Sequence, residues 1–208
     1  MSKIGLGGSC HWCTEAVFRS LRGVADVEQG WLAAQDADAV QGIEADPATG
    51  STVNGALVAA GFSEGVIVHF DESRLPLALL VEIHLHSHSA TNSHALRHRY
   101  RSALYCFDEV QRHRVAEMLT DLQSHFSEPL LTEALRYRDF SPSRPGIRDY
   151  YYRQPDKPFC QISIQPKLRA LLADYGDWVD VAQRRTILEA EAELAPPSGE
   201  GVIRADHR

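Results

Sequence analysis

Two cysteines with the spacing of a redox pair, Cys10 and Cys13, stand at the start of a predicted helix. Gly7 and Gly8 precede them, allowing a sharp turn and leaving room for a substrate. Apolar residues then recur at helical spacing, so Cys10 is expected at a helix N-terminus. The N–H groups and the dipole there favour a thiolate, so the pKa of Cys10 is expected below its usual range. A thiolate is a nucleophile, which makes Cys10 the candidate catalytic residue.

Other interpretations of these cysteines stay open. Cys10 could be an inert buried residue, although the glycines before it and the helix after it favour a reactive one. The spacing of Cys10 and Cys13 also matches the Cys-x-x-Cys pair of thioredoxin-like proteins, but one such pair is weak evidence. Cys106 follows an apolar stretch and is expected in the core.

A second group of reactive side chains lies in residues 84–98. Five histidines fall within these fifteen residues: His84, His86, His88, His94 and His98. Imidazoles are common metal ligands, so a zinc site shared with Cys10 and Cys13 is one hypothesis. A solvated loop rich in histidine is the simpler interpretation, and a third places one or two rings beside a substrate. We expect no metal.

The composition is that of a globular protein. Hydrophobic residues make up 44% and charged residues 24% of 208 residues, enough for a sizeable core. The net charge of −7 argues against a nucleic-acid-binding protein. The N-terminus shows no apolar stretch typical of a signal peptide or membrane span, so a cytoplasmic protein without membrane association is expected. In a reducing cytosol its four cysteines should be catalytic, metal-binding or buried.

Strands and helices alternate along the chain, which predicts an α/β or α+β fold. The predicted strands cover 3–6, 23–33, 65–70, 100–106 and 130–137. The predicted helices follow Cys10 and cover about 50–61, 75–85, 108–126 and 166–194, with Asp108 as a cap. Residues 139–148 are expected to form a loop, followed by a short aromatic helix.

Four separated motifs resemble, in order, those of the A-type peptide methionine sulfoxide reductases. The segment 7–18 (GGSCHWCTEAVF) resembles the family signature Gly-Gly-Gly-Cys-Phe-Trp. Residues 63–71 resemble a strand of the family, and His84 precedes Tyr100 by the family's spacing. Residues 155–168 resemble a C-terminal segment that often carries a recycling cysteine, here Cys160. The resemblance covers residues 3–170.

This resemblance implies an α+β fold, a two-layer sandwich with a mixed sheet and a ferredoxin-like core. Residues 1–170 would form the catalytic domain, and 171–195 a helical C-terminal extension packed on it. The tail, 196–208, is expected to be disordered.

The resemblance also implies a thiol-dependent reduction of a sulfoxide. Cys10 would attack the sulfur and become a sulfenic acid, while Glu64 gives a proton to the oxygen and Tyr100 hydrogen-bonds it. Cys160 would then form a disulfide with Cys10, with Cys13 as the alternative resolving thiol. A thioredoxin-type dithiol would supply the electrons, without a cofactor. The expected substrate-binding residues are His11, Trp12, Trp31 and Tyr150.

Several positions depart from the family pattern. His11 stands where the family has Phe, Trp31 where it has Tyr, and Ala95 where it has Asp. Residues 97–99 (RHR) replace Gly-Thr-Gln, and 146–147 (GI) replace Tyr-His. Altered binding residues usually change the substrate before the chemistry. The alternatives are methionine sulfoxide, another small sulfoxide such as an anionic one held by Arg97 or Arg99, a non-catalytic redox sensor or binding protein, or a Cys/His metal-binding protein.

Overall fold

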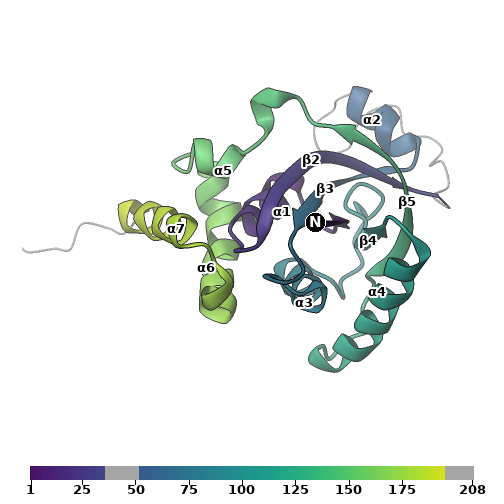
Figure 1. The fold of residues 1–208 in the computed structure, drawn as a ribbon. Helices are drawn as coiled ribbons and strands as arrows, with labels where there is room; N and C mark the ends of the chain where they lie inside the picture. The colour runs from purple at the N-terminus through teal and green to yellow at the C-terminus, as the bar shows by residue number, and fades with distance from the viewer. Residues whose placement is uncertain (36–51, 195–208) are drawn as a thin grey trace, which may run out of the picture.

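A computed structural model describes residues 1–35 and 52–194, and five strands form its sheet. They are β1 (Ser2–Gly7), β2 (Val24–Ala34), β3 (Phe62–Phe70), β4 (Ala103–Cys106) and β5 (Glu133–Pro142). The order is β1-β3-β2-β5-β4, and β4 pairs with β1, so the sheet closes on itself (Figure 1). The β4–β5 pair is parallel and the others are antiparallel. The predicted α+β fold with a mixed sheet is confirmed. The closure of the sheet is a feature that the two-layer prediction did not include.

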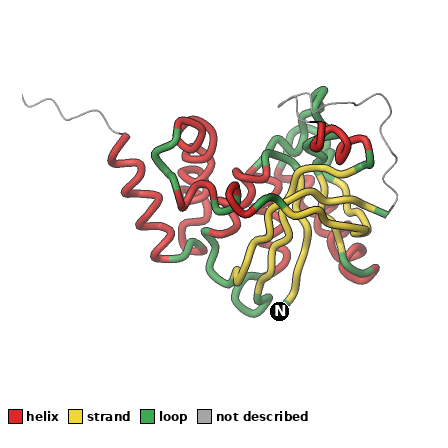
Figure 2. The backbone as a smooth tube through the Cα atoms, turned by 90° about the horizontal axis from the view of Figure 1, so that it is seen from above, coloured by secondary structure: helices red, strands yellow, loops and turns green. Residues whose placement is uncertain are grey.

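Seven helices are described: α1 (His11–Arg19), α2 (Thr52–Ala59), α3 (Leu77–Ser87), α4 (Glu109–Leu122), α5 (Tyr150–Arg153), α6 (Gln165–Tyr175) and α7 (Val181–Leu194). As predicted, Asp108 caps α4, because its carboxylate accepts a hydrogen bond of 2.7 Å from the Gln111 N–H. A π-helical turn, Cys160–Ile164, leads into α6. Figure 2 shows these helices gathered mainly to one side of the strands.

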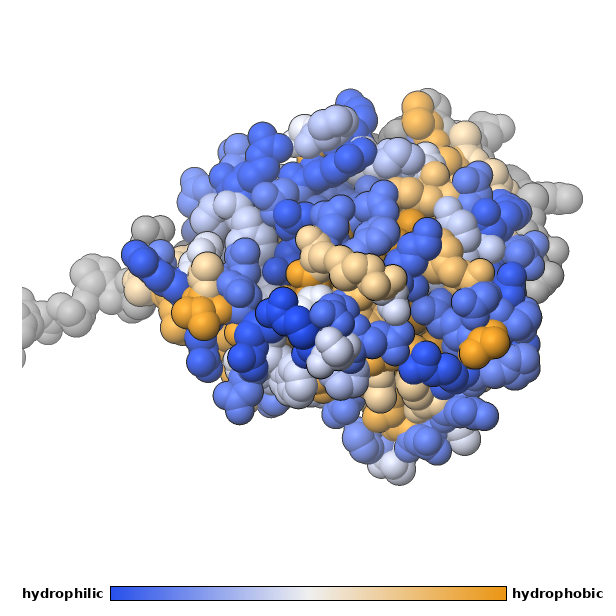
Figure 3. Space-filling view, in the orientation of Figure 1, coloured by the Kyte–Doolittle hydropathy of each residue, from blue (hydrophilic) through white to orange (hydrophobic). Residues whose placement is uncertain are grey.

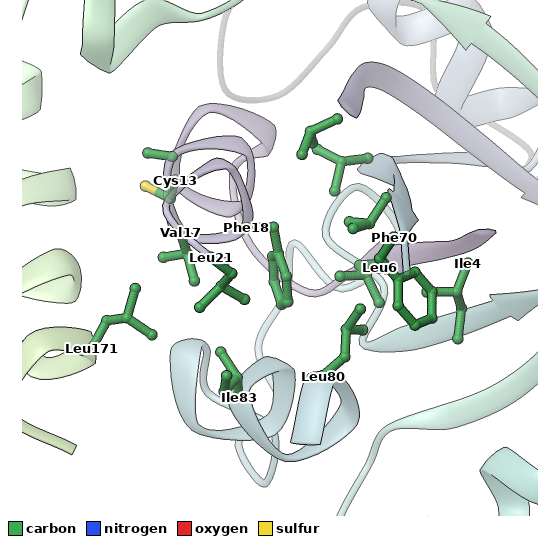
Figure 4. Close-up of a cluster of buried hydrophobic side chains, with 14 of the residues drawn as sticks. Ile4, Leu6, Cys13, Val17, Phe18, Leu21, Phe70, Leu80, Ile83 and Leu171 are labelled. Carbon is green, nitrogen blue, oxygen red and sulfur yellow. The ribbon is translucent and has the colours of Figure 1, made fainter. Parts of the chain in front are cut away.

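The main core lies where α1 and α3 pack against the sheet (Figure 4). Ile4 and Leu6, alternate residues of β1 that share one face of the strand, are fully buried in this core. Phe18 of α1 and Leu80 of α3 face them. This packing fixes the end of β1, and therefore the turn that carries Cys10.

The C-terminal part, predicted to be helical over 166–194, consists of the two helices α6 and α7. It breaks at a 3₁₀ turn, Gly176–Trp178, and α7 begins after Asp180, whose carboxylate accepts a 2.9 Å hydrogen bond from the Ala182 N–H. Leu171 of α6 and Ile187 of α7 are buried in the main core. The division of the chain at residue 170 remains a prediction, and the tail 196–208 lies outside the described residues.

Two strands are longer than the sequence predicted. β3 begins at Phe62, three residues early, because Phe62, Ser63 and Glu64 pair with the far end of β2. β5 continues to Pro142, into the predicted loop, because residues 137–142 pair with the other edge of β2. These extensions bring Glu64 and the end of β5 beside Trp31 of β2, and so build the floor of the candidate site.

Within the described residues, no helix has the length and apolar character needed to cross a membrane. The face seen in Figure 3 is largely hydrophilic, with small separate apolar patches.

Candidate functional site

Cys10 lies in the turn between β1 and α1, as the N-cap residue of the helix. Its carbonyl accepts hydrogen bonds from the N–H groups of Cys13 (3.0 Å) and Thr14 (3.1 Å), and the residue as a whole is partly exposed. Gly8 turns the chain with φ +148°, and a Cβ there would lie 2.4 Å from the His88 ring. The glycine is therefore needed at this position both for its backbone conformation and for the close approach of His88.

The acid–base behaviour of Cys10 differs from the prediction. A hydrogen bond with Cys13, together with burial, raises the pKa of Cys10 well above its usual range. The same hydrogen bond lowers the pKa of Cys13, assisted by the positive charge of Lys167. Of the two thiols, Cys13 therefore loses its proton more readily than Cys10. The predicted low pKa considered the helix end alone, whereas the neighbouring sulfur decides the outcome.

Cys160 is fully buried at the start of the π-helical turn, and burial raises its pKa to about 11. Cys13 lies between this turn and Cys10, because its sulfur is 4.0 Å from the Ser163 carbonyl oxygen and also contacts the Cys10 thiol. Cys106 is buried in β4, as predicted for a core residue. All four thiols are free in this structure.

Glu64 is the centre of a buried charged group. It is 1% exposed, and its Oε1 accepts a hydrogen bond in an ion pair with Arg99. Its Oε2 accepts from the His11 backbone N–H (3.1 Å) and lies 2.8 Å from His11 Nδ1. The Arg99 guanidinium also lies 5.2 Å from the ring centres of Trp31 and Tyr100. Both carboxylate oxygens are therefore used as acceptors.

His11 is buried between Glu64 and Gln29. With the Gln29 amide oriented to satisfy its neighbours, its oxygen accepts from His11 Nε2 at 2.9 Å. Burial alone would lower the pKa of His11, but its hydrogen bonds to Cys10 and Glu64 outweigh burial and raise the pKa to about 9. His11 is therefore positively charged at neutral pH. Its Nδ1 lies 3.9 Å from the Cys10 sulfur.

An aromatic group borders the site on the side away from Glu64. Trp12 stacks on Tyr150 with ring centres 4.4 Å apart, and Phe159 meets Trp12 edge-on at 5.4 Å. The Trp12 indole N–H donates a 2.8 Å hydrogen bond to the Ile147 carbonyl. Trp31, in contrast, is 5% exposed and lies beneath Arg99. Trp12 and Tyr150 are thus better placed than Trp31 to touch a substrate.

The structure brings together the expected site residues from five parts of the chain: Cys10, His11, Trp12, Trp31, Glu64, Tyr100 and Tyr150. Burial and the charge of Glu64 raise the pKa of Tyr100, which therefore keeps its hydroxyl proton. The proposed anion-binding role of Arg97 finds no support, because its guanidinium donates to the carbonyls of Ser89, Asn92 and Tyr100. Arg99 is likewise held by Glu64.

The histidine-rich segment divides into buried and exposed parts. His84 is buried and His88 is half-buried, and His88 bonds the His84 carbonyl (2.7 Å) and the Ser102 hydroxyl (2.7 Å). His86 and His94 are exposed. In the described part of the chain, the clusters with metal-ligand spacing are Cys10–His11–Glu64 and Glu82–His86–His125, so the hypothetical zinc set of Cys10 and Cys13 with this segment is not assembled. The charge of Arg99 on Glu64 opposes a cation at the first cluster.

Sequence reasoning missed the residues that support the site. Glu15 is buried, and its carboxylate accepts hydrogen bonds of 2.9 Å from the Asp149 N–H. Asp149 has a left-handed backbone with φ 55°, and this contact holds the chain just before Tyr150. A carboxylate among the apolar residues of a helix was the signal available for Glu15. Gln29 and Phe159 offered no such signal, because only the fold brings them to the site.

A cavity of about 350 Å³ lies behind the site, between α3 and α6. Val17, His88 and Lys167 are among the residues that line it. Cys10 does not, so this cavity is separate from the chemistry described above.

A family model described as "Peptide methionine sulfoxide reductase" matches residues 2–177. A peptide methionine sulfoxide reductase MsrA of Trichodesmium erythraeum is 30% identical, over 86% of this chain and 98% of that protein. The crystal structure of Mxr1 from Saccharomyces cerevisiae in reduced form has a TM-score of 0.59 at 18% identity, covering 76% of this chain and 88% of that one. Mxr1 in complex with Trx2 has a TM-score of 0.50 at 16% identity, covering 69% and 81%.

The two kinds of comparison support different statements. The solved structures share the fold, and the family model extends over most of the chain, including Cys10, Glu64 and Tyr100. The chain therefore belongs to the peptide methionine sulfoxide reductase family and is an oxidoreductase that acts on sulfur.

Proposed function

We propose that this protein reduces methionine sulfoxide, with Cys10 as the nucleophile. Cys10 attacks the sulfoxide sulfur, the oxygen passes to the cysteine as a sulfenic acid, and methionine leaves. The observation that carries the proposal is the meeting of Cys10, a partly exposed residue, with His11 and Glu64: the Cys10 sulfur, a ring nitrogen of His11 and a carboxylate oxygen of Glu64 lie within 4.8 Å of one another. In this arrangement a substrate can reach Cys10, and proton donors lie close to the nucleophile.

The surrounding residues suggest how the substrate is held. The stacked rings of Trp12 and Tyr150 offer an apolar wall for the methyl group. The Tyr100 hydroxyl, which keeps its proton, is the proposed hydrogen-bond donor to the sulfoxide oxygen. The contacts of Glu64 argue against the proton-donor role expected for it, because Arg99 and His11 occupy both of its oxygens.

The thiol arrangement favours Cys13 as the first resolving cysteine. Its sulfur contacts Cys10 and has a lowered pKa, so it is ready to attack the sulfenic acid, release water and form a disulfide. Cys160, next to Cys13 but fully buried, would exchange with that disulfide afterwards. Since Mxr1 forms a complex with Trx2, a thioredoxin-type dithiol is the proposed reductant.

Replacing each resolving thiol tests this order. We expect Cys13→Ala to slow multiple turnover with thioredoxin strongly and Cys160→Ala to slow it less, while both keep one full turnover. A Cys13→Ala protein with wild-type thioredoxin turnover would show that Cys160 acts directly on Cys10.

The substrate is tested with purified protein and dithiothreitol, by comparing the S and R sulfoxides of blocked methionine with a panel of small sulfoxides. Turnover of the S epimer supports the proposal, with Cys10→Ser as the inactive control. Turnover of another sulfoxide alone would mean that the altered residues serve a new substrate. Absence of turnover with every sulfoxide tested would favour a non-catalytic thiol sensor.

A further inference from the structure

We propose that His11 is the proton-transfer partner of Cys10, giving its own proton to the sulfoxide oxygen and taking the thiol proton in its place. The inference rests on the proposed function and deepens it. It gives a catalytic role to a residue that was expected only to line the substrate.

Distance supports this assignment. His11 Nδ1 lies 3.9 Å from the Cys10 sulfur and 2.8 Å from Glu64 Oε2. When the sulfur of Cys10 attacks a sulfoxide, the oxygen on the attacked sulfur can come within hydrogen-bond reach of Nδ1. Glu64 is itself engaged by Arg99, so His11 is the group in this cluster with a transferable proton beside the nucleophile.

The hydrogen bonds of His11 favour its charged form independently of any titration. Nδ1 faces Glu64 Oε2, and Nε2 faces the Gln29 amide oxygen at 2.9 Å. Both partners are acceptors, and only an imidazolium has an N–H for each. The ionised Glu64, fixed by Arg99, therefore orients and stabilises a proton donor, in the manner of the third residue of a catalytic triad.

The charges around His11 agree with a donor that is available at neutral pH. The titratable groups that face it are the Cys10 thiol at the start of α1 and the carboxylate of Glu64 in β3, which is itself paired with Arg99. Their balance raises the pKa of His11 to about 9. The acid form is present below this pH and is lost above it.

The step balances without another reactant. The Cys10 sulfur bonds to the sulfoxide sulfur while His11 Nδ1 gives its proton to the oxygen. The proton of the Cys10 thiol then passes to His11 and restores its charged form. The hydroxyl moves to the Cys10 sulfur as the S–O bond of the substrate and the new S–S bond both break, which releases the thioether and leaves a sulfenic acid. The substrate sulfur gains two electrons and the Cys10 sulfur loses two.

The test compares wild type with His11→Asn, which keeps a hydrogen-bonding group near the ring position but cannot titrate. His11→Gln is the second variant, and His113→Asn, at an exposed position of α4, is the matched control. Single-turnover formation of methionine is measured from pH 6 to pH 10, and circular dichroism checks folding. We expect His11→Asn to be at least about 100-fold slower at pH 7.5. The wild-type rate should fall above about pH 9, and the variant should lack this fall.

A second readout does not need reductase activity. In a Cys13→Ser background, the rate at which iodoacetamide alkylates Cys10 reports its thiolate. The charge of His11 lowers the pKa of Cys10, so His11→Asn should slow alkylation at pH 7.5 at least about tenfold. Equal alkylation, or single turnover within threefold of wild type across the pH range, would overturn the proposal. Wild type that alkylates as expected but reduces no sulfoxide would instead contradict the proposed function.

Discussion

Two histidines beside the Gly8 turn differ in charge at neutral pH, because His11 is positively charged and His88 is neutral. His11 has its pKa raised to about 9, whereas burial lowers the pKa of His88 to about 4. Burial acts in the same direction on both rings, so their partners make the difference. His11 faces the carboxylate of Glu64, while His88 faces a carbonyl and the Ser102 hydroxyl and lies near the positive charges of Arg97 and Lys167. The surroundings of His11 therefore stabilise a charged ring, whereas those of His88 stabilise a neutral ring.

Removing the charge of Glu64 should break this contrast most severely. In Glu64→Gln, His11 and Arg99 would be buried without a compensating anion, so the free energy of unfolding should fall by about 3–5 kcal/mol. Urea denaturation measures the loss. Glu133→Gln, which removes an exposed partner of Arg101, is the control and should change little. Equal stability of the two variants would contradict the charged cluster.

The charge of His11 should appear as a pH-dependent stability. Its folded pKa of about 9 lies above the usual 6.5, so its contribution is complete below pH 6.5 and is lost as the pH rises through 9. Between these two pH values, the contribution of His11 to the free energy of unfolding falls by about 3 kcal/mol. Urea denaturation from pH 6 to 9.5 should show His11→Asn losing less stability than wild type over this range. Parallel curves would mean that His11 is uncharged in the fold.

His88 should show the opposite dependence. Its folded pKa of about 4 lies below the usual 6.5, so stability is complete above pH 6.5 and is lost as the pH falls through 4. At pH 5, the preference of the fold for a neutral His88 ring lowers the free energy of unfolding by about 2 kcal/mol relative to pH 7. Denaturation at pH 7 and pH 5 should show a smaller acid loss in His88→Asn than in wild type. An equal loss would place the acid sensitivity elsewhere.

The smallest expected effect concerns the close approach of the His88 ring to Gly8. Gly8→Ala would place a Cβ against the His88 ring at a φ of +148°, so we expect a loss of about 1–2 kcal/mol. Adding His88→Ala should restore part of it, measured as a coupling energy in a double-mutant cycle. Strictly additive losses would show that the backbone angle alone requires glycine.

The sequence allowed the position of Cys10 at a helix start and the fold class to be predicted, because both depend on local signals. Cys10 follows glycines and precedes an amphipathic helix, and the predicted strands alternate with helices. The Glu64–Arg99 ion pair could not be predicted, because it joins residues 35 apart through a strand pairing and a loop. The pKa of Cys10 was predicted in the wrong direction, because the helix end is a local feature and the hydrogen bond with Cys13 depends on side-chain geometry.

The end of β5 shows the same limit. Residues 139–148 contain two prolines and a glycine, which favour a loop, yet 139–142 pair with β2. The edge offered by β2 outweighs the local preference, since strand pairing depends on the partner.

The most direct test of the account is to ask where the sulfoxide oxygen goes. A Cys13→Ser, Cys160→Ser protein is mixed with the S sulfoxide of blocked methionine and dimedone, and the adduct is located by mass spectrometry. The account predicts about one equivalent of blocked methionine per protein and a dimedone adduct on Cys10. Methionine formation without that adduct, or the same yield from a protein that also carries Cys10→Ser, would contradict the central claim that Cys10 attacks the sulfoxide.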